Sequence, residues 1–272
     1  MHLPVHGVSI PKLGLGTYKL TGADGTRGVE HALDLGYRHI DTAQIYRNEA
    51  EVGRGLAQSP VDREAVFLTT KVWHDKLAHA DVIASTEESL RKLGTDYVDL
   101  LLIHWPNDAV DLAETLDAFQ QLRADGKTRL IGVSNFPPGT LRRALEIVPD
   151  LATNQVEYHP YLDQSALLGI VDTRALSLTS YSPLAQGRLF QDDTLVEIAE
   201  GHGKSVAQVV LRWHLQQERV FAIPKASSDT HRAGNFDVFD FALSDDEMAR
   251  IHGLARPDGR IVDPGFGPDW DA

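Results

Sequence analysis

Four residues whose side chains suit proton transfer stand at or just after successive strand-like segments of the chain. Asp41 ends a short extended run, and Tyr46 follows five residues later in the stretch GYRHIDTAQIYRNE. Lys71 follows the apolar run AVFLTT, and His104 follows YVDLLLI. A free tyrosine has a pKa of about 10, which is too high for ready proton exchange at neutral pH. A nearby ammonium would lower that pKa, and a carboxylate would orient the ammonium and balance its charge.

Such a set suits protonation of a carbonyl oxygen, or deprotonation of an alcohol, during hydride transfer. His104 could donate a hydrogen bond to the substrate oxygen. No side chain supplies a hydride, so this chemistry requires a redox cofactor. Taken singly, each residue has an ordinary explanation, and Asp41 alone would be read as a turn former. Only the combination of the four predicts catalysis.

The elements that must position these residues alternate between short strands and helices. Apolar spacing and turn residues predict eight strands, at residues 13–17, 38–41, 65–70, 97–103, 129–133, 152–156, 176–181 and 220–223. An opening hairpin is expected from residues 5–10 and 13–17, on either side of Pro11. Short connections between alternating strands and helices favour a parallel sheet with right-handed crossovers.

Helix ends are marked by two N-terminal capping patterns. Asp111 is followed three residues later by Glu114, and Ser244 is followed at the same spacing by Glu247. In this pattern the first side chain accepts a backbone hydrogen bond, and the second returns one. We therefore expect helices to begin next to Asp111 and Ser244.

Two folds fit this order of elements, a closed (β/α)8 TIM barrel and an open doubly wound sheet. The open sheet normally carries G-x-G-x-x-G after its first strand. Here Lys19 stands where the third glycine would follow Gly14 and Gly16. We therefore predict an α/β fold with a single barrel domain over residues 1–272, preceded by an N-terminal β-hairpin. Barrel enzymes build their sites at the carboxyl ends of the strands, where the four residues would meet.

The composition excludes several classes of function. The chain has 26 basic and 39 acidic residues, a net charge of -13 that disfavours nucleic acid and anionic membranes as partners. The absence of cysteine excludes disulfides, iron–sulfur clusters and a catalytic thiol. No pair among the 12 histidines forms His-x-His or His-Glu-x-x-His, so no metal is expected. The start MHLPVHGVSIPK lacks the pattern of a signal peptide, and we expect a cytoplasmic protein.

Seven motifs in order carry a resemblance to a known family: GYRHIDTAQIYRNE, TTKVW, LLIHWP, IGVSNF, QVEYHP, YSPL and IPK. Over roughly residues 14–240 the chain resembles the aldo-keto reductases. The resemblance implies reduction of small-molecule carbonyls with NADPH by a monomeric enzyme, with NADH use possible. It also implies that Tyr46 is the general acid/base, that Lys71 and Asp41 lower its pKa, and that His104 positions the carbonyl.

The same resemblance implies which residues contact the cofactor and the substrate. Ser134, Asn135 and Gln155 would hold the nicotinamide carboxamide, and Tyr181 would stack on its ring. Ser134 and Asn135 could instead cap the helix that begins near Gly139. The other cofactor contacts implied are Thr17, Asp41, Ser182, Leu184, Gln186, Lys225, Ser227, His231 and Asn235. The substrate pocket would be formed by Tyr18, Tyr46, Trp73, His104 and Trp105.

Lys225 and Ser227 are expected to contact the adenosine 2′-phosphate, which favours NADPH. Family members often have an arginine six residues after this lysine, where this chain has His231 followed by Arg232. They often have a glutamate where Gly234 stands. Both departures weaken the expected grip on the adenosine end.

The tail RIVDPGFGPDW, followed by Asp271, is similar to the ends of the bacterial 2,5-diketo-D-gluconate reductases. In the family this segment folds as a loop over the barrel mouth and shapes the substrate pocket. The implied substrates are small aldehydes, α-dicarbonyls such as methylglyoxal, and keto-sugar acids such as 2,5-diketo-D-gluconate. Two alternatives stay open, a nucleotide-bound sensor or interaction subunit with little turnover, and a metal-dependent hydrolase on the same barrel.

Overall fold

The computed structural model describes residues 1–270, and Asp271 of the tail pattern lies outside the described residues. Eight parallel strands form one curled sheet, in which each strand pairs with the next along the chain. They lie within two residues of their predicted ends. The strands are β3 (Leu15–Gly16), β4 (His39–Asp41), β5 (Phe67–Val72), β6 (Val98–Ile103), β7 (Thr128–Ser134), β8 (Thr153–Glu157), β9 (Ser177–Tyr181) and β10 (Val220–Ala222).

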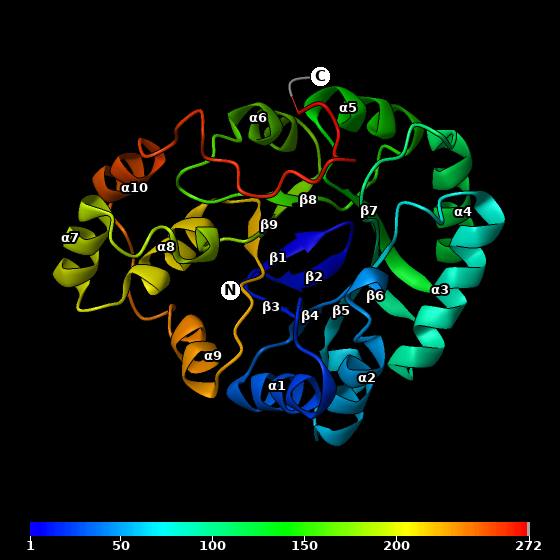
Figure 1. The fold of residues 1–272 in the computed structure, drawn as a ribbon, viewed down its shortest axis with the longest axis horizontal. Coiled ribbons are helices and arrows are strands. Elements are labelled where there is room, and N and C mark those ends of the chain that lie inside the picture. Colours follow the sequence, from blue (N-terminus) through cyan, green and yellow to red (C-terminus); the bar gives the residue numbers. More distant parts are fainter. Residues whose placement is uncertain (271–272) are drawn as a thin grey trace.

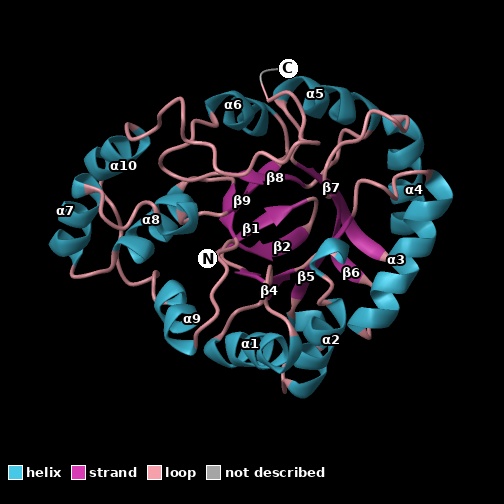
Figure 2. Cartoon of the chain, in the orientation of Figure 1, coloured by secondary structure: helices cyan, strands magenta, loops and turns pink. Residues whose placement is uncertain are grey.

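The first and eighth strands of this sheet are joined to each other. Parallel bridges link Leu13 with Ala222 and Gly16 with Lys225. The Gly14 N–H also donates to the Ala222 carbonyl at 2.9 Å. The strands therefore surround a common centre (Figure 2). This arrangement is consistent with the predicted (β/α)8 barrel and not with an open sheet, whose edge strands stay unpaired.

The helices lie outside the strands (Figure 1). Helix α1 buries Val29, Ala32 and Leu33, the face predicted from their spacing, and ends at Gly36 with φ 108°, a conformation that glycine adopts readily. No helix among residues 1–270 is long and apolar enough to cross a membrane. The helices are α1 (Gly22–Leu35), α2 (Glu49–Gln58), α3 (His79–Leu93), α4 (Leu112–Ala124), α5 (Pro138–Ile147), α6 (Ser165–Thr173), α7 (Asp193–His202), α8 (Val206–Gln216), α9 (Asp229–Phe236) and α10 (Asp245–His252), with short 3-10 helices η1 (Gln44–Tyr46), η2 (Arg63–Ala65) and η3 (Ala185–Gly187).

The N-terminal hairpin is present, but its strands differ from the prediction. It consists of β1 (His2–Val5) and β2 (Val8–Pro11), so it ends at Pro11 and residues 13–17 belong to the barrel. The turn residues His6 and Gly7 both have positive φ, which is typical of a tight two-residue hairpin turn. The hairpin packs into one apolar cluster with barrel side chains, and its members are Val5, Ile10, Phe67, Leu100, Leu102, Leu130, Ala152 and Phe221.

One of the two predicted capping boxes forms. Ser244 and Glu247 exchange hydrogen bonds at the start of α10. Asp111 accepts from the Ala113 N–H at the start of α4, but Glu114 does not return the bond. Its carboxylate accepts the His79 N–H of α3 instead, at 2.9 Å. That part of the prediction was wrong because a neighbouring helix supplied a competing donor.

Asp99 on β6 is a buried carboxylate that we expect to stabilise the barrel. It is 1% exposed and accepts from Arg63 Nη1 and Arg129 Nη1, each at 2.9 Å, and from the Leu68 N–H at 3.0 Å. Asp99→Asn should lower the free energy of unfolding by about 2–4 kcal/mol, because both arginines lose their charged acceptor. Urea denaturation measures this loss. The control is Asp150→Asn, whose half-exposed ion pair with Arg123 should contribute less than about 1 kcal/mol; equal losses in the two variants would contradict the prediction.

Candidate active site

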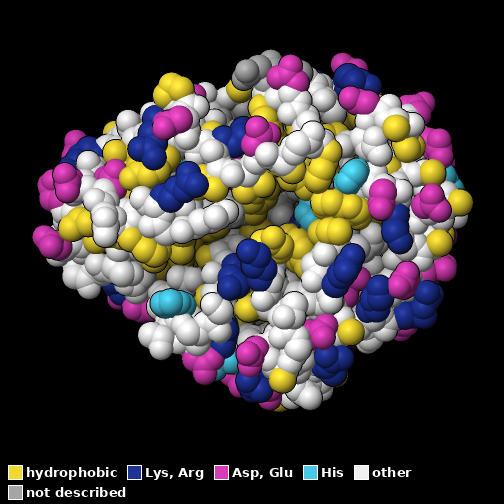
Figure 3. Space-filling model, viewed as in Figure 1, with side chains coloured by type: hydrophobic (Ala, Val, Ile, Leu, Met, Phe, Trp, Pro, Cys, Tyr) yellow, Lys and Arg dark blue, Asp and Glu magenta, His cyan; other side chains and the backbone are white. Residues whose placement is uncertain are grey.

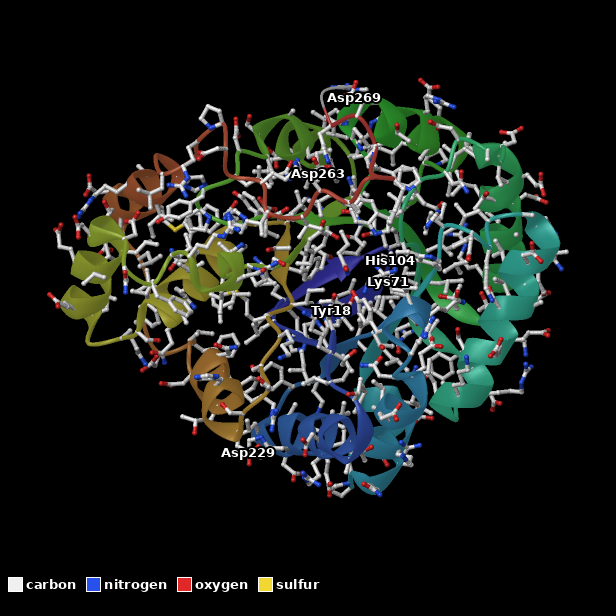
Figure 4. All side chains as sticks on the ribbon, viewed as in Figure 1. Tyr18, Lys71, His104, Asp229, Asp263 and Asp269 are labelled. Carbon is white, nitrogen blue, oxygen red and sulfur yellow. The ribbon has the colours of Figure 1, made fainter. Side chains whose placement is uncertain are left out.

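The strand register places three of the four candidate catalytic side chains, Asp41, Lys71 and His104, on the inner face of the barrel. Asp41 on β4 pairs with Thr69 on β5, and Lys71, two residues further along, pairs with Leu102 on β6. His104 follows two residues after Leu102. Because the side-chain period of a strand is two residues, the three side chains project from one face. Lys71 and His104 accordingly lie close together inside the ring of strands (Figure 4).

Tyr46 joins these three at the end of η1. The Lys71 Nζ lies 2.5 Å from Asp41 Oδ1, 2.9 Å from the Thr42 carbonyl and 5.0 Å from the centre of the Tyr46 ring. The Tyr46 and His104 rings meet edge-on with centroids 5.6 Å apart. The structure therefore brings together all four residues predicted to be catalytic.

The environment of Tyr46 differs from the expectation that Lys71 lowers its pKa. Burial raises the pKa of Tyr46 well above 10, and the charges of Asp41 and Tyr18 add to this effect. Lys71 is itself paired with Asp41, and burial lowers the pKa of Lys71. The net result is a phenol that stays protonated at neutral pH. A protonated phenol can act as a proton donor, which is the role that carbonyl reduction requires.

The pKa of His104 is shifted in the opposite direction from that of Tyr46. Burial lowers it well below 6.5, and the positive charges of Lys71 and His74 lower it further. At pH values above the pKa of His104 its imidazole is neutral. At pH values below the pKa of Tyr46 its phenol is protonated. We therefore expect kcat for carbonyl reduction to be flat between about pH 6 and pH 8. A pH profile of kcat tests this, and an inflection near the ordinary histidine pKa would contradict it.

Strained backbone concentrates in the loops that follow the carboxyl ends of the strands. Left-handed φ values in residues other than glycine are uncommon and cluster at functional sites. Among the described residues with such φ, only His6 lies outside the loops that follow β3, β4, β7 and β9. Those within the loops are Lys19, Arg47, Asn135, Ser182, Ala185 and Gln186.

The residues expected to hold a nicotinamide lie next to the catalytic residues and bond to each other. Gln155 Nε2 donates to Asp41 Oδ2 at 2.8 Å, and Ser134 Oγ donates to the Gln155 carbonyl at 2.7 Å. Tyr181 donates its hydroxyl to Asn135 Oδ1 at 2.8 Å. This group therefore borders Asp41 directly. Asn135 Oδ1 would have to give up its hydrogen bond from the Tyr181 hydroxyl before it could accept one from a carboxamide.

The alternative role of Ser134 and Asn135 as helix caps is wrong. Helix α5 begins at Pro138, with Pro137 as its N-cap and no side chain capping it. Asn135 Nδ2 instead donates to the His104 carbonyl at 2.9 Å. The two side chains therefore hydrogen-bond to backbone carbonyls at the ends of neighbouring strands and do not cap the helix.

Thr17 has the buried polar atom that best fits a cofactor. It is 0% exposed, and within residues 1–270 its Oγ1 has no hydrogen-bond partner. Its N–H donates to the Asp41 carbonyl at 3.0 Å, so Thr17 lies next to one of the residues predicted to be catalytic. Ser182 and Leu184 are partly buried and Gln186 is exposed in the loop after β9. An unpaired hydroxyl and a strained loop at the strand ends fit the dinucleotide expected from the sequence.

Arg232 stands next to the position where family members often have an arginine, and its own contacts already occupy it. Its guanidinium is buried and donates to Asp229, to His31 Nδ1 at 3.2 Å and to the Ala226 carbonyl at 3.0 Å. Asp229 lies at the periphery between α9 and α1, away from the labelled catalytic residues (Figure 4). The expected contacts Lys225, Ser227 and His231 are exposed in this region, and Asn235 is buried in α9.

The substrate side of the mouth is aromatic. Tyr18 is 53% exposed and lies 5.1 Å from the Tyr46 ring, and Trp73 lies 5.1 Å from the His104 ring. Trp105 is 5% exposed, about as buried as His104 at 7%. The space-filling view shows a hollow at the centre of this face, bordered by hydrophobic side chains (Figure 3). Two residues of the tail expected over the barrel mouth, Phe266 and Trp270, pack against Trp105.

Comparison with known proteins agrees with this geometry. The Aldo/keto reductase family profile matches residues 12–256. The chain belongs to the aldo-keto reductase family. It is 44% identical over 255 residues to the glyoxal reductase of Bacillus subtilis (strain 168), which covers 92% of this chain and 91% of that protein.

Two solved structures of related proteins show the same fold. One, provisionally assigned as a 2,5-diketo-D-gluconic acid reductase B, is 50% identical with a TM-score of 0.96 and covers 100% of this chain and 98% of the other. The second, a variant of Gox0644 in complex with NADPH, is 37% identical with a TM-score of 0.91 and covers 97% and 96%. The chain is therefore an oxidoreductase of the aldo-keto reductase family.

Sequence reasoning missed several residues that support this aldo-keto reductase site. Gln44 Oε1 accepts the Trp73 N–H at 3.1 Å and so ties η1 to the end of β5. Asn48 is fully buried and donates to the carbonyls of Thr17 and Leu20, each at 2.8 Å. Both flank Tyr46 in the sequence, and their polar character so near a catalytic residue was the available signal.

Proposed function

We propose that this protein reduces aldehydes and ketones to alcohols with NADPH, with α-dicarbonyls, small aldehydes and keto-sugar acids as its substrate class. The observation that carries the proposal is the assembled set of Asp41, Tyr46, Lys71 and His104. The similarity to a glyoxal reductase and to a protein assigned as a diketogluconic acid reductase supports the substrate class.

NADPH, when bound, supplies the hydride for the carbonyl carbon. The Tyr46 hydroxyl donates its proton to the carbonyl oxygen. The neutral His104 donates a hydrogen bond to the same oxygen and so fixes the direction of the carbonyl. As Tyr46 loses its proton, the Lys71 ammonium beside its ring stabilises the phenolate, and Asp41 holds that ammonium in place.

Thr17, Ser134, Asn135, Gln155 and Tyr181 are the residues that would hold the nicotinamide half of the cofactor. Their buried hydrogen-bonding groups adjoin Asp41, as this role requires. The complex of a Gox0644 variant with NADPH supports the choice of cofactor.

Lys225 and Ser227 would hold the 2′-phosphate of NADPH, because an ammonium and a hydroxyl are both exposed in the loop after β10. Lys225→Ala should lower kcat/KM for NADPH by about tenfold or more, since a charge-assisted bond to phosphate is lost. The value for NADH should stay within about twofold, because NADH lacks that phosphate. Steady-state kinetics with both cofactors on one substrate measures this. Equal losses for the two cofactors would place the phosphate elsewhere.

The proposal is tested by following NADPH consumption with glyoxal, methylglyoxal, 4-nitrobenzaldehyde and 2,5-diketo-D-gluconate. We expect turnover with at least one of these carbonyls. Binding of NADPH without turnover on any of them would favour the alternative of a nucleotide-bound sensor. Within residues 1–270 no group of three His, Asp or Glu side chains could hold a metal ion, so the structure offers no support for the hydrolase alternative.

A further inference from the structure

The C-terminal segment of residues 255–270 has no helix or strand of its own. Two of its side chains, Phe266 and Trp270, nevertheless pack beside the residues expected to line the substrate pocket, and we call this pair the aromatic wall. The Phe266 ring lies 5.6 Å from the rings of Trp73 and Trp105, and the Trp270 ring lies 6.0 Å from that of Trp105. Without regular hydrogen bonding, the segment is placed by its contacts with the barrel. The position of the wall therefore depends on where the segment is anchored.

One buried carboxylate on β8 forms the anchor nearest to this wall. Glu157 is 0% exposed, and its Oε1 and Oε2 accept the backbone N–H groups of Ile261 and Val262, each at 2.8 Å. His159 Nε2 lies 2.9 Å from the same Oε1. Hydrogen bonds to a charged acceptor are roughly twice as strong as neutral ones. A single side chain thus fixes two consecutive amides of an otherwise irregular segment.

The earlier contacts of the segment hold it further from the pocket. The Arg256 N–H donates to the Tyr161 carbonyl at 3.1 Å, and the Arg256 guanidinium lies 4.0 Å from the Tyr161 ring. Gly259 packs so closely that a Cβ there would lie 1.8 Å from the same carbonyl. Asp263, the residue after Val262, lies on the same stretch of the tail (Figure 4), and Phe266 follows three residues later. Glu157 is therefore the last of these anchors before the chain reaches Phe266.

Glu157 also shares a strand with the catalytic groups. It stands two residues after Gln155 on β8, so both side chains project from the same face. Gln155 donates to Asp41 Oδ2, and Glu157 pairs in register with Tyr181 on β9. A shift of the Glu157 anchor would therefore move the wall relative to the reacting groups.

We propose that Glu157 is a positioning residue, whose carboxylate fixes the aromatic wall over the pocket and so sets the affinity for carbonyl substrates large enough to touch Phe266. The inference rests on the carbonyl reductase function proposed above. An aromatic aldehyde such as 4-nitrobenzaldehyde reaches the wall, whereas glyoxal is small enough to react without it. The role of Glu157 should therefore depend on substrate size.

The test compares Glu157→Gln with the wild-type full-length protein. Glutamine keeps the size of the side chain but loses the charge and one acceptor oxygen. We expect hydrogen exchange at the amides of Ile261 and Val262 to speed up by about tenfold or more. KM for 4-nitrobenzaldehyde should rise about tenfold, while kcat and the KM for glyoxal change by less than about twofold. The matched control is Glu49→Gln, a buried carboxylate that accepts the Thr70 hydroxyl, which should leave exchange at the two amides unchanged.

A double-mutant cycle with Phe266→Ala separates positioning from a general loss of stability. If Glu157 acts through the wall, Glu157→Gln should raise the KM for 4-nitrobenzaldehyde much less when Phe266 is already absent. Unchanged exchange at Ile261 and Val262, or the same rise in KM with and without Phe266, would overturn the proposal. Glu157→Asp, which keeps the charge but shortens the side chain, replaces Glu157→Gln if that variant fails to fold. Hydrogen exchange needs no turnover, so the anchor is tested even if the protein reduces none of the carbonyls.

Discussion

Tyr46→Phe is expected to lower kcat for carbonyl reduction by about 10²–10⁴-fold, the range in which a positioned general acid contributes. The substitution removes only the hydroxyl oxygen, so the ring keeps its contacts with His104 and with the Lys71 ammonium. The carbonyl oxygen then loses its proton donor, and His104 alone can only hydrogen-bond to it. Steady-state and single-turnover kinetics on methylglyoxal measure the loss.

Two other causes of a lower kcat in Tyr46→Phe, a damaged fold and weaker cofactor binding, are excluded by measuring Tm and the Kd for NADPH. We expect the Kd for NADPH and the Tm of Tyr46→Phe to stay close to the wild-type values. The control is Tyr97→Phe, the same chemical change at a partly exposed ring that stacks on Arg63. It should leave kcat within about twofold of the wild type. Wild-type turnover by Tyr46→Phe would remove Tyr46 from its role as proton donor.

Lys71→Met should affect both activity and stability. Lys71 and Asp41 are 0% and 1% exposed, so removing the ammonium leaves a carboxylate buried with no countercharge. Breaking one side of a buried ion pair costs about 3–5 kcal/mol. Turnover should fall as well, because the Tyr46 phenolate loses the cation that stabilises it. Chemical denaturation and kinetics on the same preparation measure the two effects.

The double variant Lys71→Met/Asp41→Asn separates those two effects. Neutralising Asp41 removes the buried charge, so a large part of the lost stability should return. Turnover should not return, since the double variant still lacks the ammonium beside Tyr46. A single variant as stable as the wild type, or a double variant with restored turnover, would contradict this account of the pair.

The meeting of the four candidate catalytic residues could be predicted from the sequence because parallel strands in register bring their ends to one place. Lys71 and His104 each follow a strong apolar run and Asp41 ends a short extended one, and the barrel leaves few ways to arrange such ends. Tyr46 lies in the loop after β4, so its place beside the other three was predicted from the motif GYRHIDTAQIYRNE and not from strand register. The strands themselves could be predicted because their side chains are buried on both faces.

What the sequence did not predict depends on partners chosen between distant residues. The direction of the Tyr46 pKa follows from its burial and from the nearby charges of Asp41 and Tyr18, which no spacing reveals. The sequence shows Arg232 next to His231 but not its partners, which lie in α1 and in its own helix. Glu157 stands in the motif QVEYHP, yet the two tail amides that it accepts lie more than a hundred residues away in an irregular segment.

We expect this chain to direct a hydride from NADPH to a carbonyl carbon while its own residues protonate the oxygen. The most direct measurement uses NADPH carrying deuterium at the transferable nicotinamide position, with methylglyoxal as substrate and mass spectrometry of the product. We predict one deuterium on the new alcohol carbon for each NADPH oxidised. Alcohol without deuterium, or NADPH oxidation without alcohol, would contradict the account.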